Sequence, residues 1–442
     1  MIPVRRSPHD REIVRLALPA FGALAAEPLY ILVDTAIVGH LGTNPLAGLA
    51  VAGTVLTATF AIFNFLAYST TGAVARQVGA GNRRAAAEQG VDGFWLAAGL
   101  GMGLTLFGLA LSPLIVDAMG ASSRVHPFAD TYLRISILGA PALLITLAGA
   151  GYMRGLQDTR ATLVIAVAAN AANIVIEVAF VYGLDLGIAG SAWGTVLAQY
   201  GAALAYIGIA ARTVRLEHAS VRPQAAGIRA TARVGGRLVI RTGSLLAAFL
   251  AATAIASRIG DDDVAAHQIA FQVFLFLGLS LDALAIAGQA MVGRFLGAED
   301  AGEARAAARR MIEWGVTVGV VFGVGLALLR PLIVPLFTPD AAVQDLALQV
   351  LLIVAAMQPL NAVVFVLDGV LIGAGDVSYL AAAMLVATLG VFAPAAAAVL
   401  VLDGGLLWLW GALALWMLAR CVGMAVRYAG SRWQVTGAVR AA

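Results

Sequence analysis

Three carboxylates, Glu27, Asp34 and Glu177, lie inside long apolar stretches in the first half of this 442-residue chain. A charged side chain at the centre of a membrane span costs about 2.5–3.5 kcal/mol on insertion scales, so each of them needs a reason. Two carboxylates held close together in a medium of low dielectric cannot both ionise cheaply. A pair of this kind is expected to load and release a proton or another cation.

Asp34 and Glu177 occupy equivalent depths, because each lies a few residues before the same end of its apolar stretch. Asn173 precedes Glu177 by one helical turn and shares its face, and Thr195 follows in the next stretch. We expect these four side chains to form a coupling cluster. The alternative for the two acids is that each simply reaches towards the membrane interface.

Three further polar residues extend the expected cluster: Glu27, Asn170 and Gln199. Glu27 lies seven residues before Asp34, Asn170 seven before Glu177, and Gln199 four after Thr195. These spacings place each of them on the face of its partner. Glu27 also stands beside Pro28, so it is equally suited to partner a break in the helix.

Pro19 and Pro28 both interrupt the first apolar stretch. Proline removes one backbone hydrogen bond and bends a helix. A bent helix that also carries an acid can couple protonation to bending, whereas a static kink would have no such role.

The elements that must hold these residues are membrane-spanning helices. The chain is 61% apolar and only 12% charged, about half the charge of a soluble protein. A span needs about 20 apolar residues, and the sequence predicts twelve of them: 13–38, 46–72, 91–113, 130–151, 161–182, 188–211, 233–257, 264–289, 312–337, 345–370, 378–400 and 406–428. The predicted fold is an all-α integral membrane protein.

Several functions are excluded or disfavoured by the composition. All 28 basic residues are Arg, so the lysine of a phosphate-binding GxxxxGK[ST] loop is missing. Cys421 is the only cysteine, and the five histidines show no metal-ligand spacing. We expect no enzyme activity, no cofactor, no metal and no nucleic-acid partner.

Arginine placement predicts the orientation in the membrane. Arginines precede the first span, occupy alternate loops and follow the last span, and those at the two ends of the chain are Arg5, Arg6, Arg11, Arg427, Arg432 and Arg440. The opposite loops carry mainly aspartates. By the positive-inside rule both termini are cytoplasmic.

A shift of 218 residues aligns the chain with itself. PLIV at 113–116 meets PLIV at 331–334, and Pro141 meets Pro359. The match fades in the last span of each half. We expect two pseudo-symmetric six-helix bundles, residues 1–211 and 233–442, joined by a cytoplasmic linker at 212–232. An even number of spans makes them parallel repeats that enclose a cleft and rock to give alternating access.

Ion chemistry is expected to be concentrated in the first bundle. The 218-shifted counterparts of Glu27, Asp34 and Glu177 are apolar. A duplicated channel or scaffold is disfavoured by acids that belong to one half. A flippase of lipid-linked precursors would be expected to show extra helices and a strongly cationic cavity.

Four motifs resemble those of the multidrug and toxic compound extrusion (MATE) family, in its DinF-like branch. They are LPAFGALAAEPLY followed by VDTAIVGHLG (33–42), the paired loops RQVGAG and GRFLGA, and LDGVLIGAGD (367–376). The resemblance covers nearly the whole chain. It implies two six-helix lobes and cation-coupled export of amphipathic, often cationic, organic compounds.

The resemblance also implies roles for individual residues. Asp34 matches the proton-coupling aspartate of helix 1, and Thr195 matches a threonine of helix 6. Asn173 and Glu177 fall on an Asn and an Asp of helix 5, so Glu177 is a departure that keeps the charge. Pro19 matches the helix 1 proline linked to bending.

Coupling through the second lobe, as in the NorM-like branch, is disfavoured because Asn361 stands where that branch has an acid. The predicted function is therefore a proton-coupled, or alternatively sodium-coupled, drug antiporter. We expect it to act as a monomer in the bacterial inner membrane.

Overall fold

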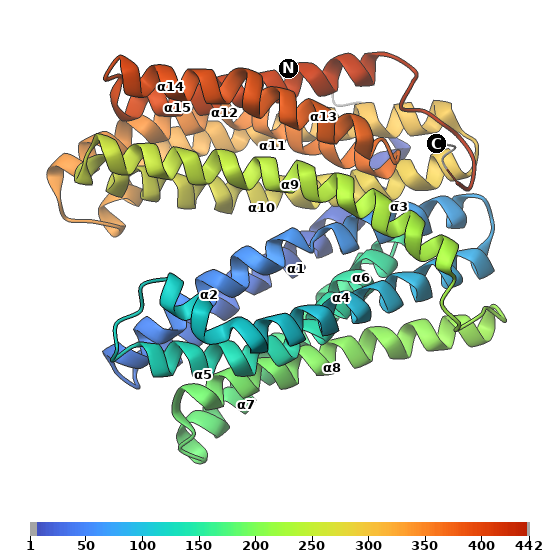
Figure 1. The fold of residues 1–442 in the computed structure, drawn as a ribbon. Coiled ribbons are helices and arrows are strands. Elements are labelled where there is room, and N and C mark those ends of the chain that lie inside the picture. Colours follow the sequence, from blue (N-terminus) through green and yellow to red (C-terminus); the bar gives the residue numbers. More distant parts are fainter. Residues whose placement is uncertain (1–6, 440–442) are drawn as a thin grey trace. The chain divides into compact units, whose positions relative to one another are not determined.

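The computed structural model describes residues 7–439, and this part of the chain consists of helices joined by short loops, with no strand (Figure 1). Arg5, Arg6 and Arg440 therefore lie outside the described residues. The helices are α1 (Pro8–Gly39), α2 (Thr43–Ile62), α3 (Phe65–Gly79), α4 (Arg83–Ala118), α5 (His126–Ser136), η1 (Ile137–Gly139), α6 (Ala140–Gly155), α7 (Thr159–Val178), η2 (Ala179–Gly183), α8 (Gly187–Leu216), α9 (Ala225–Ile259), α10 (Asp261–Gly297), α11 (Ala301–Ile333), η3 (Val334–Leu336), α12 (Ala341–Gly373), α13 (Val377–Ala387), η4 (Thr388–Phe392), α14 (Ala393–Val401) and α15 (Gly405–Ala429).

Twelve helical stretches of the described chain are long and apolar enough to cross a membrane. Some combine several elements: α2 continues into α3, α5 into α6 through η1, and α13 into α14 through η4. Eleven of these stretches contain a span predicted from the sequence, and the predicted span 312–337 runs one residue past the stretch Ala301–Leu336. The predicted all-α fold with twelve membrane helices is confirmed.

Aspartates define where several of these helices begin. The side chain of Asp158 accepts a hydrogen bond from the backbone N–H of Ala161, at 3.1 Å, and starts α7. Asp300 starts α11 in the same way, and Asp340 starts α12. Such caps satisfy backbone donors that have no partner within the helix.

The internal repeat is visible in the helix bounds themselves. The stretch Thr43–Gly79 is equivalent to Asp261–Gly297 at the shift of 218 residues, and Thr159–Gly183 is equivalent to Val377–Val401. The last stretch of each half also begins at equivalent positions, Gly187 and Gly405. The repeat thus persists in structure where the sequence match fades.

Glycines let the helices of each half approach closely at equivalent places. In the first half a side chain at Gly101 would overlap the backbone of Pro141, and one at Gly151 would overlap that of Ala67. In the second half the equivalent pairs recur and are Gly319 with Pro359 and Gly369 with Ala285. Small residues that allow close backbone contact are the usual means of packing helices in membranes.

The two halves differ in how continuous their helices are. In the first half α2 ends at Ile62 and α3 begins at Phe65, and η1 separates α5 from α6. The equivalent stretches of the second half are the uninterrupted helices α10 and α12. These two interruptions belong to the first half alone, whereas the second half has one of its own, the π-helical segment η4 between α13 and α14.

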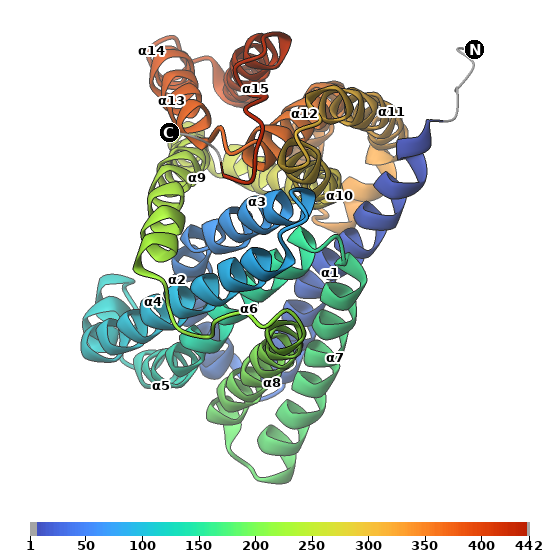
Figure 2. The ribbon, with the colours of Figure 1, turned by 90° about the vertical axis from the view of Figure 1, so that its right-hand side faces the viewer.

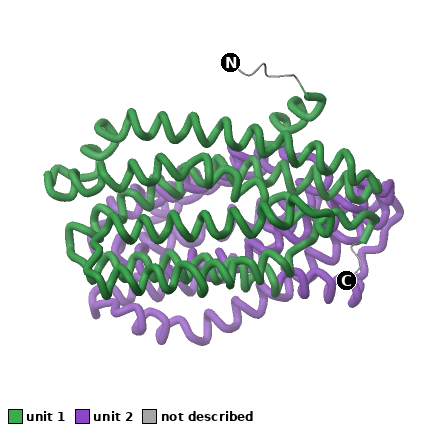
Figure 3. Tube along the Cα trace, turned by 90° about the horizontal axis from the view of Figure 1, so that it is seen from above, with its two compact units in different colours: residues 1–17, 236–442 green, residues 18–235 purple. Residues whose placement is uncertain are grey.

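The chain forms two compact units (Figure 3). Unit 2 is residues 18–235, and unit 1 contains the described part of 1–17 together with 236–442. Within unit 2, α7 lies beside α8, as Figure 2 shows. These boundaries differ from the expected ones, 1–211 and 233–442, because the first helix of each half begins in the unit of the other half. The linker between the halves is also shorter than the expected 212–232, because α8 continues to Leu216 and α9 starts at Ala225.

The exchange of first segments is symmetric within the repeat. The first ten residues of α1, up to Ala17, belong to unit 1, and the start of α9, up to Gly235, belongs to unit 2. These two end points are equivalent at the 218-residue shift. Both segments are anchored by polar contacts in the unit that they join.

The α1 segment is anchored in unit 1 by ion pairs. Arg310 donates to both oxygens of Asp10, at 2.6 and 3.0 Å, and the indole of Trp314 donates to Asp10 Oδ1 at 2.9 Å. Arg294 donates to Glu12 at 2.8 and 3.0 Å. Two-point arginine–carboxylate contacts of this kind fix geometry as well as charge.

The α9 segment is anchored in unit 2 on α4. The carboxylate of Asp92 accepts from the backbone N–H of Gln224 at 2.8 Å, and Gln89 donates to Thr231 at 3.2 Å. Asp92 is the repeat counterpart of Arg310. The two anchors therefore occupy equivalent positions but use different chemistry.

We predict that Asp10→Asn loosens the α1 anchor, because it removes the charge that Arg310 and Trp314 contact. A lost hydrogen bond to a charged group costs about 1.5–3 kcal/mol. The melting temperature of the detergent-purified protein should fall by several degrees, measured by tryptophan fluorescence. Asp345→Asn, at an exposed position of α12, is the matched control, and equal melting of the two variants would contradict the prediction.

Candidate functional site

The candidate site lies within unit 2, where three helices bring polar side chains together. Asp34 comes from the C-terminal half of α1, Glu177 from the end of α7, and Ser191 from the first turns of α8. Asp34 is 5% exposed, and Glu177 and Ser191 are fully buried. The hydroxyl of Ser191 donates to Asp34 Oδ1 at 2.6 Å. The Glu177 carboxylate lies next to both.

Glu177 is the unusual member of this group. Neither of its carboxylate oxygens has a partner in hydrogen-bond geometry within the described chain. Burying an ionised carboxylate without donors is costly, so the group must be neutralised by a proton or a bound cation. The structure thus places a carboxyl that demands a positive charge beside a second acid.

A chain of neutral polar groups lies beside the two acids. The hydroxyl of Tyr30 is hydrogen-bonded to Thr195 Oγ1 at 2.7 Å, and Asn173 Nδ2 donates to the same oxygen at 3.2 Å. Tyr30 is close enough to feel the charges of both Asp34 and Glu177. Asn173 Oδ1 has no hydrogen-bond partner within the described residues and is a free acceptor.

The four residues expected to form the coupling cluster, Asp34, Asn173, Glu177 and Thr195, are therefore neighbours. Sequence reasoning missed Tyr30, Tyr132 and Ser191. Tyr132, from α5, lies beside Ser191 and Asp34. The available signal was spacing, because Tyr30 is four residues before Asp34 and Ser191 four before Thr195.

The structure does not bring the remaining three expected residues into this cluster. Glu27 is exposed on α1 and about 10 Å along the helix from Asp34, given 1.5 Å per residue. Asn170 instead donates to the backbone carbonyl of Ala26 at 2.9 Å. Gln199 packs against Gly139, and its side-chain oxygen has no partner within the described chain. Residues that share one face of a helix therefore need not contact each other or the same cluster.

Backbone irregularity and close packing surround Glu177. The wide turn η2 begins two residues after it and is a π-helical segment, a feature often found at functional sites. On the facing helix α8, a Cβ at Gly194 would come within 3.1–3.2 Å of the Glu177 backbone and Cβ. Glycine at this position lets α8 approach the acid closely.

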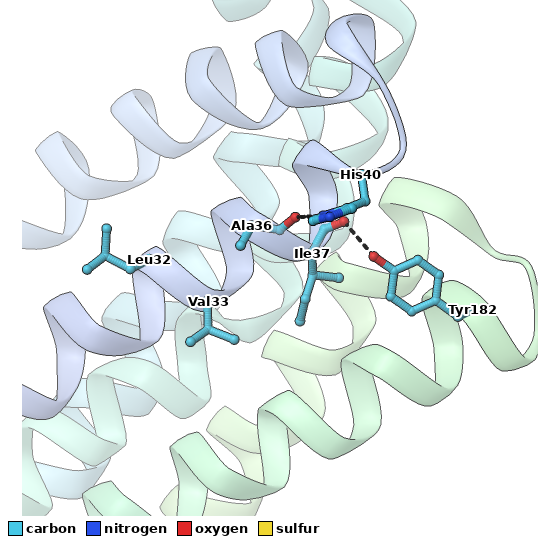
Figure 4. A pocket seen from close by; sticks show the side chains of 6 residues that line it. All are labelled: Leu32, Val33, Ala36, Ile37, His40 and Tyr182. Atoms are coloured by element: carbon cyan, nitrogen blue, oxygen red, sulfur yellow. Dashed lines mark hydrogen bonds between the residues drawn. The ribbon is translucent and has the colours of Figure 1, made fainter.

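A pocket of about 360 Å³ lies at the C-terminal end of α1 (Figure 4). Its walls are mostly apolar and come from Leu32, Val33, Ala36, Ile37, His40 and Tyr182. The Tyr182 hydroxyl, which comes from η2, donates to the carbonyl of Ile37 at 3.0 Å. This contact ties the wide turn after Glu177 to the helix that carries Asp34.

Pro19 and Pro28 both lie within α1, which remains helical across them. Pro19 follows closely on Ala17, where α1 passes from unit 1 to unit 2. Because proline lacks the N–H that would bond to the preceding turn, α1 is weakened at this passage.

The sequence model of the MatE family matches residues 19–179 and 244–397. The chain belongs to the MatE family. It is 33% identical to Protein DETOXIFICATION 44, chloroplastic, of Arabidopsis thaliana over 94% of this chain and 81% of that protein. It is 30% identical to DNA damage-inducible protein F of Escherichia coli K12 over 86% of this chain and 84% of that protein.

Solved MatE-type structures share the fold. A MATE protein in the bent conformation matches with a TM-score of 0.87 at 21% identity, over 96% of each chain. A MOP superfamily transporter from Pyrococcus furiosus matches with a TM-score of 0.85 at 22% identity, over 96% of this chain and 97% of the other. The MatE assignment confirms the family resemblance seen in the sequence: this is a multi-pass membrane transporter of a multidrug efflux family and not an enzyme.

We predict that Gly194→Ala destabilises this MatE protein, because the added methyl group must push α8 away from the backbone of Glu177. The melting temperature in detergent should fall. Gly201→Ala is the matched control on the same helix, since nothing lies within 4 Å of a Cβ there. That control should gain stability from the higher helix propensity of alanine, so a rise in both variants would contradict the close approach.

Proposed function

We propose that the protein exports small amphipathic or cationic organic compounds in exchange for protons, through alternating access of its two lobes. The observation that carries this proposal is the pair of buried acids Asp34 and Glu177, because neither carboxylate oxygen of Glu177 has a hydrogen-bond partner within the described residues. Such a pair is more stable with one positive charge bound than with none. Uptake and release of that charge on opposite sides of the membrane would drive export.

Within the proposed cycle each residue has a distinct task. Asp34 and Glu177 share the proton, and Ser191 orients Asp34 through its 2.6 Å hydrogen bond. Tyr30, Thr195 and Asn173 form the polar wall that distinguishes the loaded from the empty site. Proton loading removes the repulsion between the acids and would allow α1 to move relative to α7 and α8.

Helix α1 is the proposed link between this site and the movement of the lobes. It carries Asp34 near one end, and its other end is anchored to Arg310 and Arg294 in unit 1. Pro19 lies near the passage from one unit to the other and supplies the flexible point. A change in packing around Asp34 would therefore act through Pro19 on a helix end held by the second lobe.

Sodium is the alternative coupling ion. The acids, the free Asn173 Oδ1 and the Thr195 hydroxyl offer only oxygen ligands, which hard cations prefer. Residence of the protein in a bacterial inner membrane, as a monomer with both termini in the cytoplasm, remains part of the proposal and rests on the placement of the arginines.

We predict that Asp34→Asn abolishes ion-driven export of a fluorescent organic cation from reconstituted vesicles, because the pair can no longer exchange a proton. Asp403→Asn, in an exposed turn with positive φ, makes the same chemical change elsewhere and should export normally. Collapsing the proton and sodium gradients separately in the wild type identifies the ion. Wild-type export by Asp34→Asn would refute the proposal.

We predict that Glu177→Gln lowers the export rate strongly while Glu177→Asp keeps most of it, because the acid and not its length carries the exchange. Both variants should reach wild-type levels in the membrane, measured by immunoblot beside the vesicle assay. If Glu177→Gln exports like the wild type, the second acid has no part in coupling.

A further inference from the structure

The linker between α8 and α9 and the start of α9 carry an excess of arginine that the proposed coupling site does not use. Residues 212–237 contain six arginines and one acid, Glu217. The start of α4, residues 83–92, contributes two arginines together with the acids Glu88 and Asp92. With all of these acids counted, arginine still outnumbers carboxylate by eight to three in the two segments.

Three of the arginines lie along one face of α9. Arg229, Arg233 and Arg237 recur at every fourth residue, and all three are exposed. Side chains four residues apart lie on the same face of a helix. Thr231 and Leu238, on the opposite face, are buried. The three arginines therefore form a basic stripe that points away from the packed side of α9.

The basic stripe is available to a partner from outside, because no ion pair or side-chain hydrogen bond joins it to another residue of the described chain. The nearby acids are engaged elsewhere. Glu88 and Glu217 pair with arginines of α4, at 3.1 and 4.0 Å. Asp92 accepts the backbone N–H of Gln224 at 2.8 Å. None of these acids neutralises the stripe by direct contact.

Trp95 of α4 indicates the level of the linker in the membrane. Its indole Nε1 donates to the carbonyl of Val221 at 3.1 Å, and the two residues are 51% and 63% exposed. Tryptophan is enriched where the membrane meets water. Exposed apolar side chains at this boundary adjoin lipid chains, and the next residue along the linker, Arg222, is exposed and lies at the level of the lipid headgroups.

The linker is fixed on both sides of Arg222 as it passes α4 on the way to α9 (Figure 2). The backbone N–H of Ser220 donates to the Glu88 carboxylate at 3.2 Å, and that of Gln224 donates to Asp92 at 2.8 Å. The backbone that presents Arg222 is thus held in place before any ligand binds. Such preorganisation lowers the entropic cost of binding.

Membrane orientation alone does not account for the basic stripe. The positive-inside rule requires arginines on one side of the membrane, but it makes no demand on their alignment along a helix. Other arginines near helix ends are paired, Arg294 with Glu12 and Arg427 with Asp376. An aligned and unpaired set at the membrane surface is suited to a negatively charged ligand, and the lipid phosphate is the one that this surface provides.

We propose that Arg222 and the basic stripe bind the headgroups of anionic phospholipids in the leaflet that meets the start of α9. The arginines contact the phosphate, and the exposed Trp95 and Val221 adjoin the acyl chains. Because α9 passes from unit 2 to unit 1 after Gly235, a lipid bound here acts on the connection between the lobes. That effect on export rests on the proposed function, whereas lipid binding does not.

Native mass spectrometry of the protein in a neutral detergent tests the site. The protein is mixed with equal amounts of phosphatidylglycerol and phosphatidylcholine of the same chain length, and the retained lipids are identified by mass. We expect at least about tenfold more phosphatidylglycerol to be retained, because each arginine near an anionic surface contributes about fivefold. Equal retention would overturn the proposal. Displacement of the lipid by an equal concentration of inorganic phosphate would overturn the assignment to a lipid.

Matched variants locate the binding on α9. Arg229→Gln combined with Arg233→Gln should lower the preference for phosphatidylglycerol at least about fivefold. Arg229→Lys combined with Arg233→Lys should keep most of it, because lysine retains the charge. Arg124→Gln combined with Arg258→Gln removes two exposed arginines from other loops and should behave like the wild type. An unchanged preference in the first double variant, or an equal loss in the last, would overturn the proposal.

Reconstituted vesicles separate the lipid site from the export function. Wild-type export is compared in phosphatidylcholine alone and in an equimolar mixture with phosphatidylglycerol, and the difference should disappear in Arg229→Gln combined with Arg233→Gln. The same difference in both proteins would overturn the role of the bound lipid in export. Asp34→Asn should retain phosphatidylglycerol like the wild type. Loss of export in that variant, with the lipid preference intact, distinguishes failure of coupling from failure of lipid binding.

Discussion

The interior of a membrane protein offers no water to a buried charge, and this constraint governs the whole molecule. Each acid or arginine inside the helical bundles must find an opposite charge, a set of donors or a proton. Asp34 finds Ser191, and Asp368 finds Arg241. Neither carboxylate oxygen of Glu177 has a hydrogen-bond partner within the described chain, so a proton or a cation from outside would supply what this acid lacks.

The two halves of the chain share one arrangement of helices. Equivalent glycines let equivalent helices approach in each half, and equivalent helix bounds persist even where the sequences have diverged. The two halves nevertheless differ in which of their helices carry buried charged residues. The buried acids Asp34 and Glu177 of the first half correspond to alanines in the second at the 218-residue shift, and Arg241 and Asp368 of the second half correspond to alanines in the first. Small residues at these positions show that the packing tolerates either outcome.

The twelve spans and the two buried acids could be predicted from the sequence, for physical reasons. Hydropathy and the 218-residue repeat predicted twelve spans, because burial in a membrane leaves long apolar runs. Asp34 and Glu177 were conspicuous as acids within those runs. Ser191, Tyr30 and Tyr132 were not, since hydroxyl side chains are common in membrane helices and become informative only through their neighbours. Glu27, Asn170 and Gln199 share the expected faces, but packing between helices decides contact, and spacing along one helix does not. The membership of residues 8–17 in unit 1 also depends on tertiary contacts.

The exchanged first segments have a consequence for the history and the engineering of the chain. A fragment that ends near residue 217 would carry Asp10 and Glu12 without Arg310 and Arg294, and Asp92 without the backbone that it binds. Two copies of an ancestral half would have made contacts at these equivalent positions by trading their first turns, in the manner of a swapped dimer. Gene duplication followed by fusion would have made this exchange of first segments an intramolecular one. Halves expressed as separate polypeptides should therefore assemble only when each one keeps its own first turns.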